Sequence, residues 1–160
     1  MNTIYCDNAA TTPIYNEVIK KMSKLMLITY GNPSSIHKLG QESKAVVERA
    51  RLNIADSLMC DVSEIIFTGC GSESNNIALL GTLQEGDHLI TSSYEHPAIE
   101  AVSKTLLEQG IEVSYINPNS NGIIEPNNVK KNIKSNTKLI SIMYVNNEPG
   151  TENPIDKISL

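Results

Sequence analysis

Four short apolar runs alternate with helical segments along the chain. The runs have the length of buried strands and are bounded by turn residues, so we predict strands at 64–68, 88–92, 112–116 and 138–145. We predict helices at 41–59, 75–83, 97–109 and 126–134. Strands that alternate with helices form parallel βαβ crossovers. The sequence therefore predicts an α/β fold, a mainly parallel sheet with helices on both faces.

The helix predictions rest on spacing and on terminal signals. Within 41–59 the apolar residues recur at intervals of four, at Val46, Ala50, Ile54 and Leu58. Pro97 opens the helix 97–109 in its first turn, and Gly110 follows directly after its end.

Composition narrows the class of partner. The 160 residues fit one domain, and the net charge is −5, with 13 Lys and Arg against 18 Asp and Glu. No basic stripe is present, so we expect neither a nucleic acid nor an anionic membrane as partner. No apolar run approaches the ~20 residues that span a bilayer, and the N-terminus lacks the pattern of a signal peptide. We expect a cytoplasmic protein.

Cysteine and histidine are too scattered for a metal centre. Cys6, Cys60 and Cys70 are an odd number without C-x-x-C spacing, which argues against a disulfide framework and a zinc site. The three histidines are equally dispersed, so no metal is expected.

Glycine-rich and polar segments follow three of the predicted strands, where parallel α/β sheets bind ligands. Residues 69–76 follow the first strand and lead into a helix. Glycines allow a ligand to approach the backbone, the free N–H groups of a helix start favour phosphate, and Ser72 adds a hydroxyl. The same segment also fits a tight turn capped by Ser72 or Ser74.

The other two loops carry polar side chains. His96 stands directly before Pro97, where an imidazole can stack on an aromatic cofactor or move protons, or can simply bond to the backbone. Asn146 and Asn147 follow the last strand; an asparagine can bind a ring hydroxyl, but 146–150 also suits a turn. Three such loops on one sheet edge favour a binding site over three unrelated turns.

Longer motifs carry a resemblance to a known family. They are YCDNAATTP (5–13), YGNPSSIHKLGQE (30–42), FTGCGSESNN (67–76), SSYEHPA (92–98) and SIMYVNNEPGT (141–151). With these motifs the chain resembles the N-terminal portion of cysteine desulfurases of the nitrogen-fixation and iron–sulfur assembly type, in the class V aminotransferase family. The resemblance implies the pyridoxal-phosphate-dependent aminotransferase-like fold (fold type I).

The resemblance also implies roles for individual residues. Gly71 and Ser72 match the positions that hold the phosphate of pyridoxal 5′-phosphate, although the family usually has threonine at position 72. His96 matches the histidine that stacks on the pyridine ring and assists proton transfer. Asn147 matches the asparagine that hydrogen-bonds the ring hydroxyl oxygen.

Other family positions have no match between residues 1 and 160. These are the aspartate at the pyridine nitrogen, the Schiff-base lysine and the nucleophilic cysteine. Lys130, Lys131 and Lys134 lie on a polar helix face, and Cys70 sits in the phosphate turn. The resemblance implies that 1–13 are the N-terminal arm of the small domain and 14–160 an incomplete large domain.

The family sheet has the strand order 3-2-4-5-6-7-1, of which this chain would supply strands 1 to 4. Strands 3, 2 and 4 are then neighbours, and strand 1 lies apart from them. We expect the chain alone to be marginally folded and inactive.

The implied reaction converts L-cysteine to L-alanine and leaves the sulfur as an enzyme persulfide. A sulfur-acceptor or scaffold protein then takes the sulfur, and the full-length form is expected to be a homodimer. Two alternatives stay open. One is a selenocysteine lyase or another class V enzyme, and the other is a non-catalytic module that binds a partner subunit.

Overall fold

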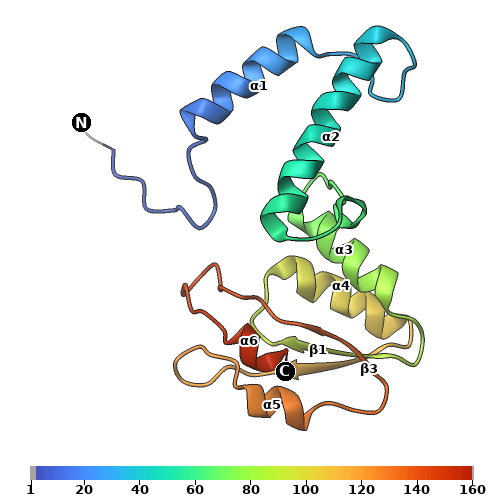
Figure 1. The fold of residues 1–160 in the computed structure, drawn as a ribbon. Helices are drawn as coiled ribbons and strands as arrows, with labels where there is room; N and C mark the ends of the chain where they lie inside the picture. The colour runs from blue at the N-terminus through green and yellow to red at the C-terminus, as the bar shows by residue number, and fades with distance from the viewer. Residues whose placement is uncertain (1–2, 160) are drawn as a thin grey trace. The chain divides into compact units, whose positions relative to one another are not determined.

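The computed structural model describes residues 3–159, and the chain forms two compact units, one up to Phe67 and one from Thr68 onward. The first unit is helical: it contains α1 (Asn16–Ile28), α2 (Lys38–Leu58) and the short 3-10 helix η1 (Val62–Glu64), coloured blue to green in Figure 1. The predicted helix 41–59 is confirmed as α2. It starts earlier than predicted because His37 Nδ1 accepts a hydrogen bond from the Gly40 N–H at 3.3 Å and so caps the helix. The expected division into 1–13 and 14–160 stays a prediction.

The predicted strand 64–68 is wrong. Glu64 ends η1, where its carboxylate accepts from the Asp61 N–H at 2.7 Å in a capping box. The residues that follow have no strand partner within 3–159, and Ile66 is 69% exposed. The Arg51 guanidinium instead donates to the Ile65 carbonyl and lies 4.9 Å above the Phe67 ring. An apolar run alone therefore does not make a strand; it also needs a neighbour to pair with.

A parallel sheet forms the centre of the second unit. Its three strands are β1 (His88–Ser92), β2 (Glu112–Ile116) and β3 (Thr137–Ser141), in the order β2-β1-β3. The predicted strands 88–92 and 112–116 are confirmed to the residue. The order also agrees with the neighbours expected from the family sheet. Both pairs are parallel, with His88 opposite Glu112 on one side and Thr137 on the other.

The strand β3 is shorter than the predicted 138–145 because the chain turns back after it. Val145 forms an isolated antiparallel bridge with Glu152. The Asn146 N–H donates to the Thr151 carbonyl at 2.9 Å. A segment that pairs with itself in this way cannot also extend beside β1.

Four helices flank the sheet: α3 (Gly71–Thr82), α4 (Pro97–Glu108), α5 (Pro126–Lys131) and α6 (Ile155–Ile158). α3 begins earlier than the predicted 75–83 because the Glu73 carboxylate accepts from the Gly69 N–H at 2.6 Å and holds the entry turn. α5 ends before residue 134 because the Lys134 N–H donates to Thr137 Oγ1 at 2.7 Å in the turn into β3. α4 matches the prediction within one residue, and neither α1 nor α6 was predicted.

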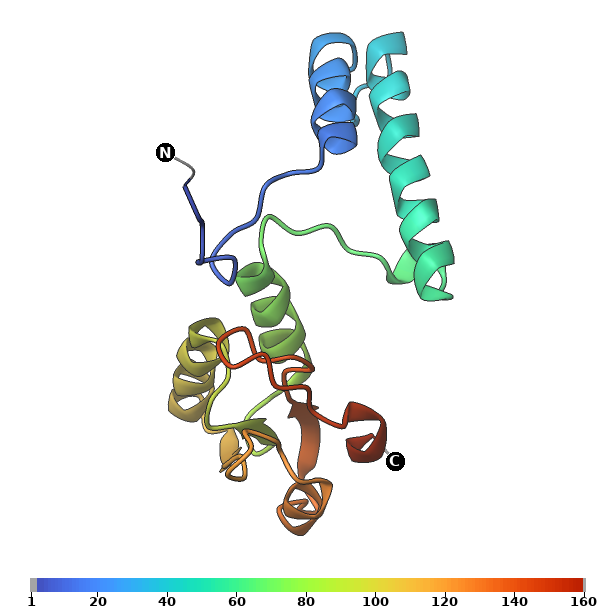
Figure 2. The ribbon, with the colours of Figure 1, turned by 90° about the vertical axis from the view of Figure 1, so that its left-hand side faces the viewer.

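The two faces of the sheet bury separate apolar clusters. One cluster joins α3 and α4 to the sheet, and its buried residues are Leu79, Leu83, Leu89, Ile99, Val102, Leu106 and Ile111. The other lies on the side of α5 and α6, with Ile90, Ile116, Ile124 and Val129 buried. Neighbours in β1 thus face opposite layers, and all five residues of that strand are buried. Figure 2 shows the helices on the two sides of the strands. The predicted parallel sheet with helices on both faces is confirmed.

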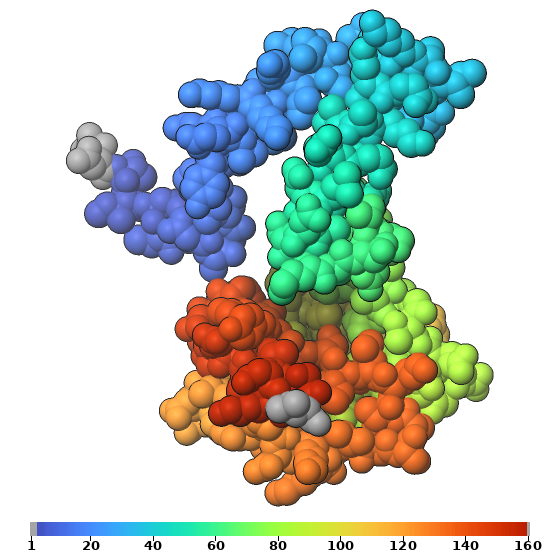
Figure 3. All heavy atoms as spheres, viewed as in Figure 1, coloured from blue at the N-terminus to red at the C-terminus, as the bar shows by residue number. Residues whose placement is uncertain are grey.

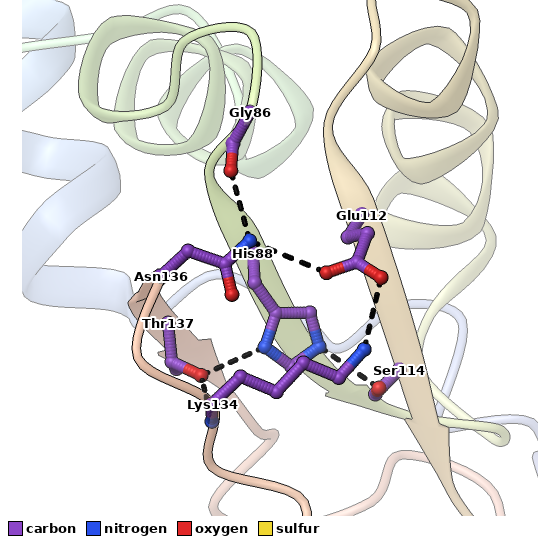
Figure 4. Close-up of polar contacts among 7 residues, drawn as sticks. All are labelled: Gly86, His88, Glu112, Ser114, Lys134, Asn136 and Thr137. Carbon is purple, nitrogen blue, oxygen red and sulfur yellow. Dashed lines mark hydrogen bonds and ion pairs between the residues drawn. The ribbon is translucent and has the colours of Figure 1, made fainter.

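His88 joins all three strands at the amino-terminal edge of the sheet (Figure 4). It is fully buried, with Nδ1 2.7 Å from Thr137 Oγ1 and Nε2 2.8 Å from Ser114 Oγ. An ion pair between Lys134 Nζ and Glu112 Oε1, at 3.0 Å, lies beside it. Burial lowers the pKa of His88 below its usual 6.5, and Lys134 lowers it further while Glu112 opposes the shift. The neutral ring is therefore the form that this edge favours.

Candidate functional site

The loops that carry His96 and Asn147 leave the sheet at the same edge. Because β1 and β3 are adjacent and parallel, the segments after Ser92 and Ser141 both start at the carboxyl edge. From its length and its connection to β1, we expect the start of α3 to reach this edge too. That helix ends shortly before β1 begins, and its 12 residues span about 18 Å, close to the ~17 Å of a five-residue strand.

The first turn of α3 presents free hydrogen-bond donors. Within 3–159 the N–H groups of Gly71, Ser72 and Glu73 have no acceptor, and the Ser72 hydroxyl has no partner. The Ser74 hydroxyl, in contrast, is 2.7 Å from Thr68 Oγ1. Unsatisfied N–H groups at a helix start attract an anion, and Ser72 adds a fourth donor. Both predicted phosphate-binding residues, Gly71 and Ser72, therefore lie in a turn that suits a phosphate.

His96 is the N-cap residue of α4 and is exposed. Its Nδ1 accepts a hydrogen bond from the Ala98 N–H at 3.1 Å. The Nδ1 lone pair is thereby used, so the neutral ring carries its proton on Nε2, an assignment that follows from this hydrogen bond. Nε2 is the atom that can meet a ligand.

The turn 146–150 presents Asn147 and buries Asn146. The Asn147 side chain is exposed, and its amide donates to Glu148 Oε1 at 3.3 Å. Asn146 is 3% exposed, and its Oδ1 accepts from the Glu148 N–H at 2.9 Å. Gly150 closes the turn at φ 71°, a conformation that glycine adopts without strain. Figure 3 shows the atoms of this turn, orange to red, at the surface of the second unit.

Hydrogen bonds tie these two loops together. The Glu95 carboxylate accepts from the Met143 N–H at 2.9 Å, and the Asn146 amide donates to the Tyr94 carbonyl at 2.8 Å. Asn153 lies beneath them, 1% exposed, and donates to the Met143 carbonyl at 2.7 Å. Sequence position singles out Asn146 only together with its neighbour Asn147 and indicates no role for Glu95 or Asn153. A local pattern does not reveal such partners, because they lie far apart in the sequence.

A side-chain hydrogen bond joins the two chain segments on either side of the 146–150 turn. The Tyr144 hydroxyl donates to Glu152 Oε1 at 2.7 Å. This hydrogen bond, together with the carboxylate charge, raises the pKa of Tyr144 above its usual 10. The phenol therefore stays protonated at neutral pH and keeps donating to the carboxylate.

The three loops form an open edge. Two hollows of this unit, of about 590 and 400 Å³, lie around Tyr144 and 152–156 and between α5 and α6, and neither is lined by Ser72, His96 or Asn147. The three cysteines are free thiols, and Cys70 is exposed in the turn that leads into α3. Across residues 3–159 no three His, Cys, Asp or Glu side chains gather as metal ligands. In the same part of the chain, no helix combines the length and apolar character needed to cross a membrane.

Residues 4–160 match the family model described as aminotransferase class-V. The chain belongs to the aminotransferase class-V family. Several relatives of this class-V chain are named cysteine desulfurase. IscS of Dictyoglomus turgidum is 41% identical over 98% of this chain and 41% of its own length. IscS of Methanosarcina thermophila is 42% identical over 97% of this chain and 39% of its own. The class-V chain thus spans about two fifths of the length of these curated relatives.

Solved structures agree with the class-V assignment. The structure titled SspA in complex with cysteine superposes with a TM-score of 0.91 at 39% identity, covering 98% of this chain and 46% of that one. A NifS-like protein gives 0.88 at 34% identity, covering 95% and 43%. The predicted resemblance and the predicted aminotransferase-like fold are confirmed.

Proposed function

We propose that this class-V chain forms the cofactor-binding edge of a pyridoxal-phosphate-dependent cysteine desulfurase. Such an enzyme converts L-cysteine to L-alanine and retains the sulfur as a persulfide. One observation carries the proposal: the loops of His96 and Asn147 are hydrogen-bonded to each other at the carboxyl edge of the sheet. The chain in which these loops are joined is 41% identical to a protein named cysteine desulfurase.

The residues at this edge suit the parts of pyridoxal 5′-phosphate. The free N–H groups at the start of α3 and the Ser72 hydroxyl suit its phosphate. The Asn147 amide can donate to the ring hydroxyl oxygen. His96 can stack on the ring, and its Nε2 is placed to hold or move a proton. When bound, the cofactor supplies an electron sink for charge that develops on the substrate.

The three loops contain no residue for a covalent link to the cofactor. Residues 69–76, 93–97 and 142–151 have no lysine. Lys134 lies at the opposite edge of the sheet, where its Nζ forms an ion pair with Glu112 Oε1 at 3.0 Å. We therefore propose that the 160-residue chain binds the cofactor without converting cysteine.

Binding and turnover can be tested separately on the purified chain. Pyridoxine 5′-phosphate, which has no aldehyde and needs no lysine, should bind saturably in isothermal titration calorimetry. Ser72→Ala should weaken binding about tenfold, and Ser72→Thr should retain it, because a hydroxyl donor to a charged phosphate is lost in one and kept in the other. Incubation with L-cysteine and pyridoxal 5′-phosphate should form no alanine above a protein-free blank. Absence of binding would contradict the cofactor site, and alanine formation would contradict the inactivity.

Replacing Gly71 by alanine should weaken the binding of pyridoxine 5′-phosphate less than replacing it by proline. A Cβ at Gly71 meets no atom within 4 Å, so Gly71→Ala should bind pyridoxine 5′-phosphate within about twofold of the parent. Gly71→Pro removes the N–H, although proline suits a first helical position and Cys70 before it is extended (φ −166°, ψ 169°). We expect G71P to keep the parent's circular dichroism spectrum and to bind about three- to tenfold more weakly. Equal affinities of the two variants would show that this N–H does not bind the phosphate.

The remaining parts of the proposal concern partners and setting. We propose that the full-length form is a cytoplasmic homodimer that passes its sulfur to an acceptor or scaffold protein. A selenocysteine lyase would share this edge, since the same cofactor is bound. A non-catalytic module would bind the cofactor without turnover and would be recognised by co-purification with a second chain.

A further inference from the structure

Two residues without an assigned role connect the His96 loop to the Asn147 loop. Glu95, directly before His96, reaches the loop of Asn147 at Met143. Asn146, directly before Asn147, reaches the loop of His96 at Tyr94. We infer that Glu95 and Asn146 form a reciprocal clasp that fixes His96 and Asn147 relative to each other, and so act as positioning residues for the cofactor ring. This inference rests on the proposed function.

Glu95 supplies an acceptor shared by two strand ends. Its Oε1 accepts from the Ser92 hydroxyl at 2.6 Å and from the Met143 N–H at 2.9 Å. Ser92 is the last residue of β1, and Met143 follows β3 by two residues. The half-buried carboxylate therefore holds the exits of two neighbouring strands together.

Asn146 supplies both a cross-loop donor and a local acceptor. Its amide nitrogen donates to the Tyr94 carbonyl at 2.8 Å, while its Oδ1 accepts from the Glu148 N–H at 2.9 Å. One side chain thus shapes the turn that presents Asn147 and also fastens this turn to the loop of His96. Because Asn146 is 3% exposed, water does not readily replace either bond.

The two site residues themselves lack such anchors. His96 and Asn147 are exposed, and their side-chain bonds reach only Ala98 and Glu148 in their own loops. Their spacing is therefore set by the residues before them. A ring that must meet both side chains at once requires this spacing to be held before binding.

Three substitutions separate the clasp from the rest of the fold. Glu95→Ala removes the shared acceptor, whereas Glu95→Gln keeps an oxygen in the same place and is its matched control. Asn146→Asp keeps the acceptor for Glu148 but puts an oxygen against the Tyr94 carbonyl, so that only the cross-loop bond is lost.

The first measurement needs no cofactor. In the ¹⁵N-labelled chain, E95A should make the Met143 amide exchange about tenfold faster, and E95Q should restore parental exchange. E95A should also shift the side-chain amide resonances of Asn147, and N146D those of the His96 ring, each on the opposite loop. Parental Met143 exchange in E95A would overturn the clasp.

The second measurement compares two ligands. In the proposed site inorganic phosphate would contact only the start of α3, whereas pyridoxine 5′-phosphate would also need the ring-facing residues. E95A and N146D should weaken pyridoxine 5′-phosphate about tenfold and leave inorganic phosphate within about twofold. Equal loss for both ligands would overturn the positioning role, because it would mean a general loss of fold. If the parent chain binds phosphate but not pyridoxine 5′-phosphate, the proposed function fails, and amide exchange still decides the clasp.

Discussion

Replacing His88 by alanine is expected to lower the free energy of unfolding of the second unit by about 3–4 kcal/mol. The substitution leaves a cavity at a fully buried position and removes one hydrogen bond each from Ser114 Oγ and Thr137 Oγ1. Urea denaturation followed by circular dichroism measures the change. His96→Ala is the matched control: this histidine is exposed and makes one local cap bond, so its loss should cost about 1 kcal/mol or less.

His88 should also make stability depend on pH. Its pKa is lowered in the folded chain, so the unfolded chain binds more protons near pH 6. The contribution of His88 to the free energy of unfolding is then fully present above the unfolded pKa of about 6.5. It is lost as the pH falls through the lower pKa of the folded chain. The slope from this one group is at most about 1.4 kcal/mol per pH unit. The groups that face it are Glu112 and Lys134, which form an ion pair with each other. The hydrogen bond from Lys134 lowers the pKa of Glu112.

Denaturation between pH 5 and 8 checks this dependence. His96→Ala should keep the parental slope. His88→Ala should flatten the slope of stability against pH. A slope equal to that of the parent in H88A would assign the pH dependence to other groups.

Asn153→Ala is expected to lower the free energy of unfolding by about 3 kcal/mol. Asn153 Oδ1 accepts from the buried Ile124 N–H at 2.8 Å, and its Nδ2 donates to the Met143 carbonyl at 2.7 Å. Alanine leaves the buried Ile124 N–H and the half-buried Met143 carbonyl without this partner. Urea denaturation of the same chain measures the loss.

Asn147→Ala is the matched control for this loss. Asn147 is exposed and bonds only its neighbour Glu148 at 3.3 Å, so its change should stay within about 0.5 kcal/mol. Equal losses for the two asparagines would contradict the role of Asn153 as a buried anchor.

The sequence predicted those parts of the fold that depend on local signals. β1 and β2 match to the residue because each is a compact apolar run with turns on both sides. The run 64–68 has the same local pattern but no strand beside it, and pairing is not a local property. The end of β3 was missed for a related reason, since Val145 pairs with Glu152 in a turn that the apolar pattern does not reveal.

The candidate site shows the same division. His96 and Asn147 stand in the segments that follow two predicted strands, where sequence position alone indicates the carboxyl edge. Ser72 was placed at the same edge through the predicted strand 64–68, which does not form. Glu95 and Asn146 are different, because their partners lie 48 and 52 residues away in the chain. Ordinary polar residues become anchors only when β1 and β3 lie side by side, which composition and spacing cannot predict.

The central place of β1 has a consequence for synthesis on the ribosome. This strand leaves the exit tunnel first, yet both of its neighbours, β2 and β3, follow it in the sequence. The ribosome must add roughly 50 further residues before β3 is complete, which takes about 3 to 10 seconds at an elongation rate of about 5–20 residues per second. During that interval a strand that is buried at every position in the finished sheet has no partner on one or both edges. Nascent chains of this protein should therefore bind a ribosome-associated holdase until the codon for Ser141 has been translated and its residue has cleared the tunnel.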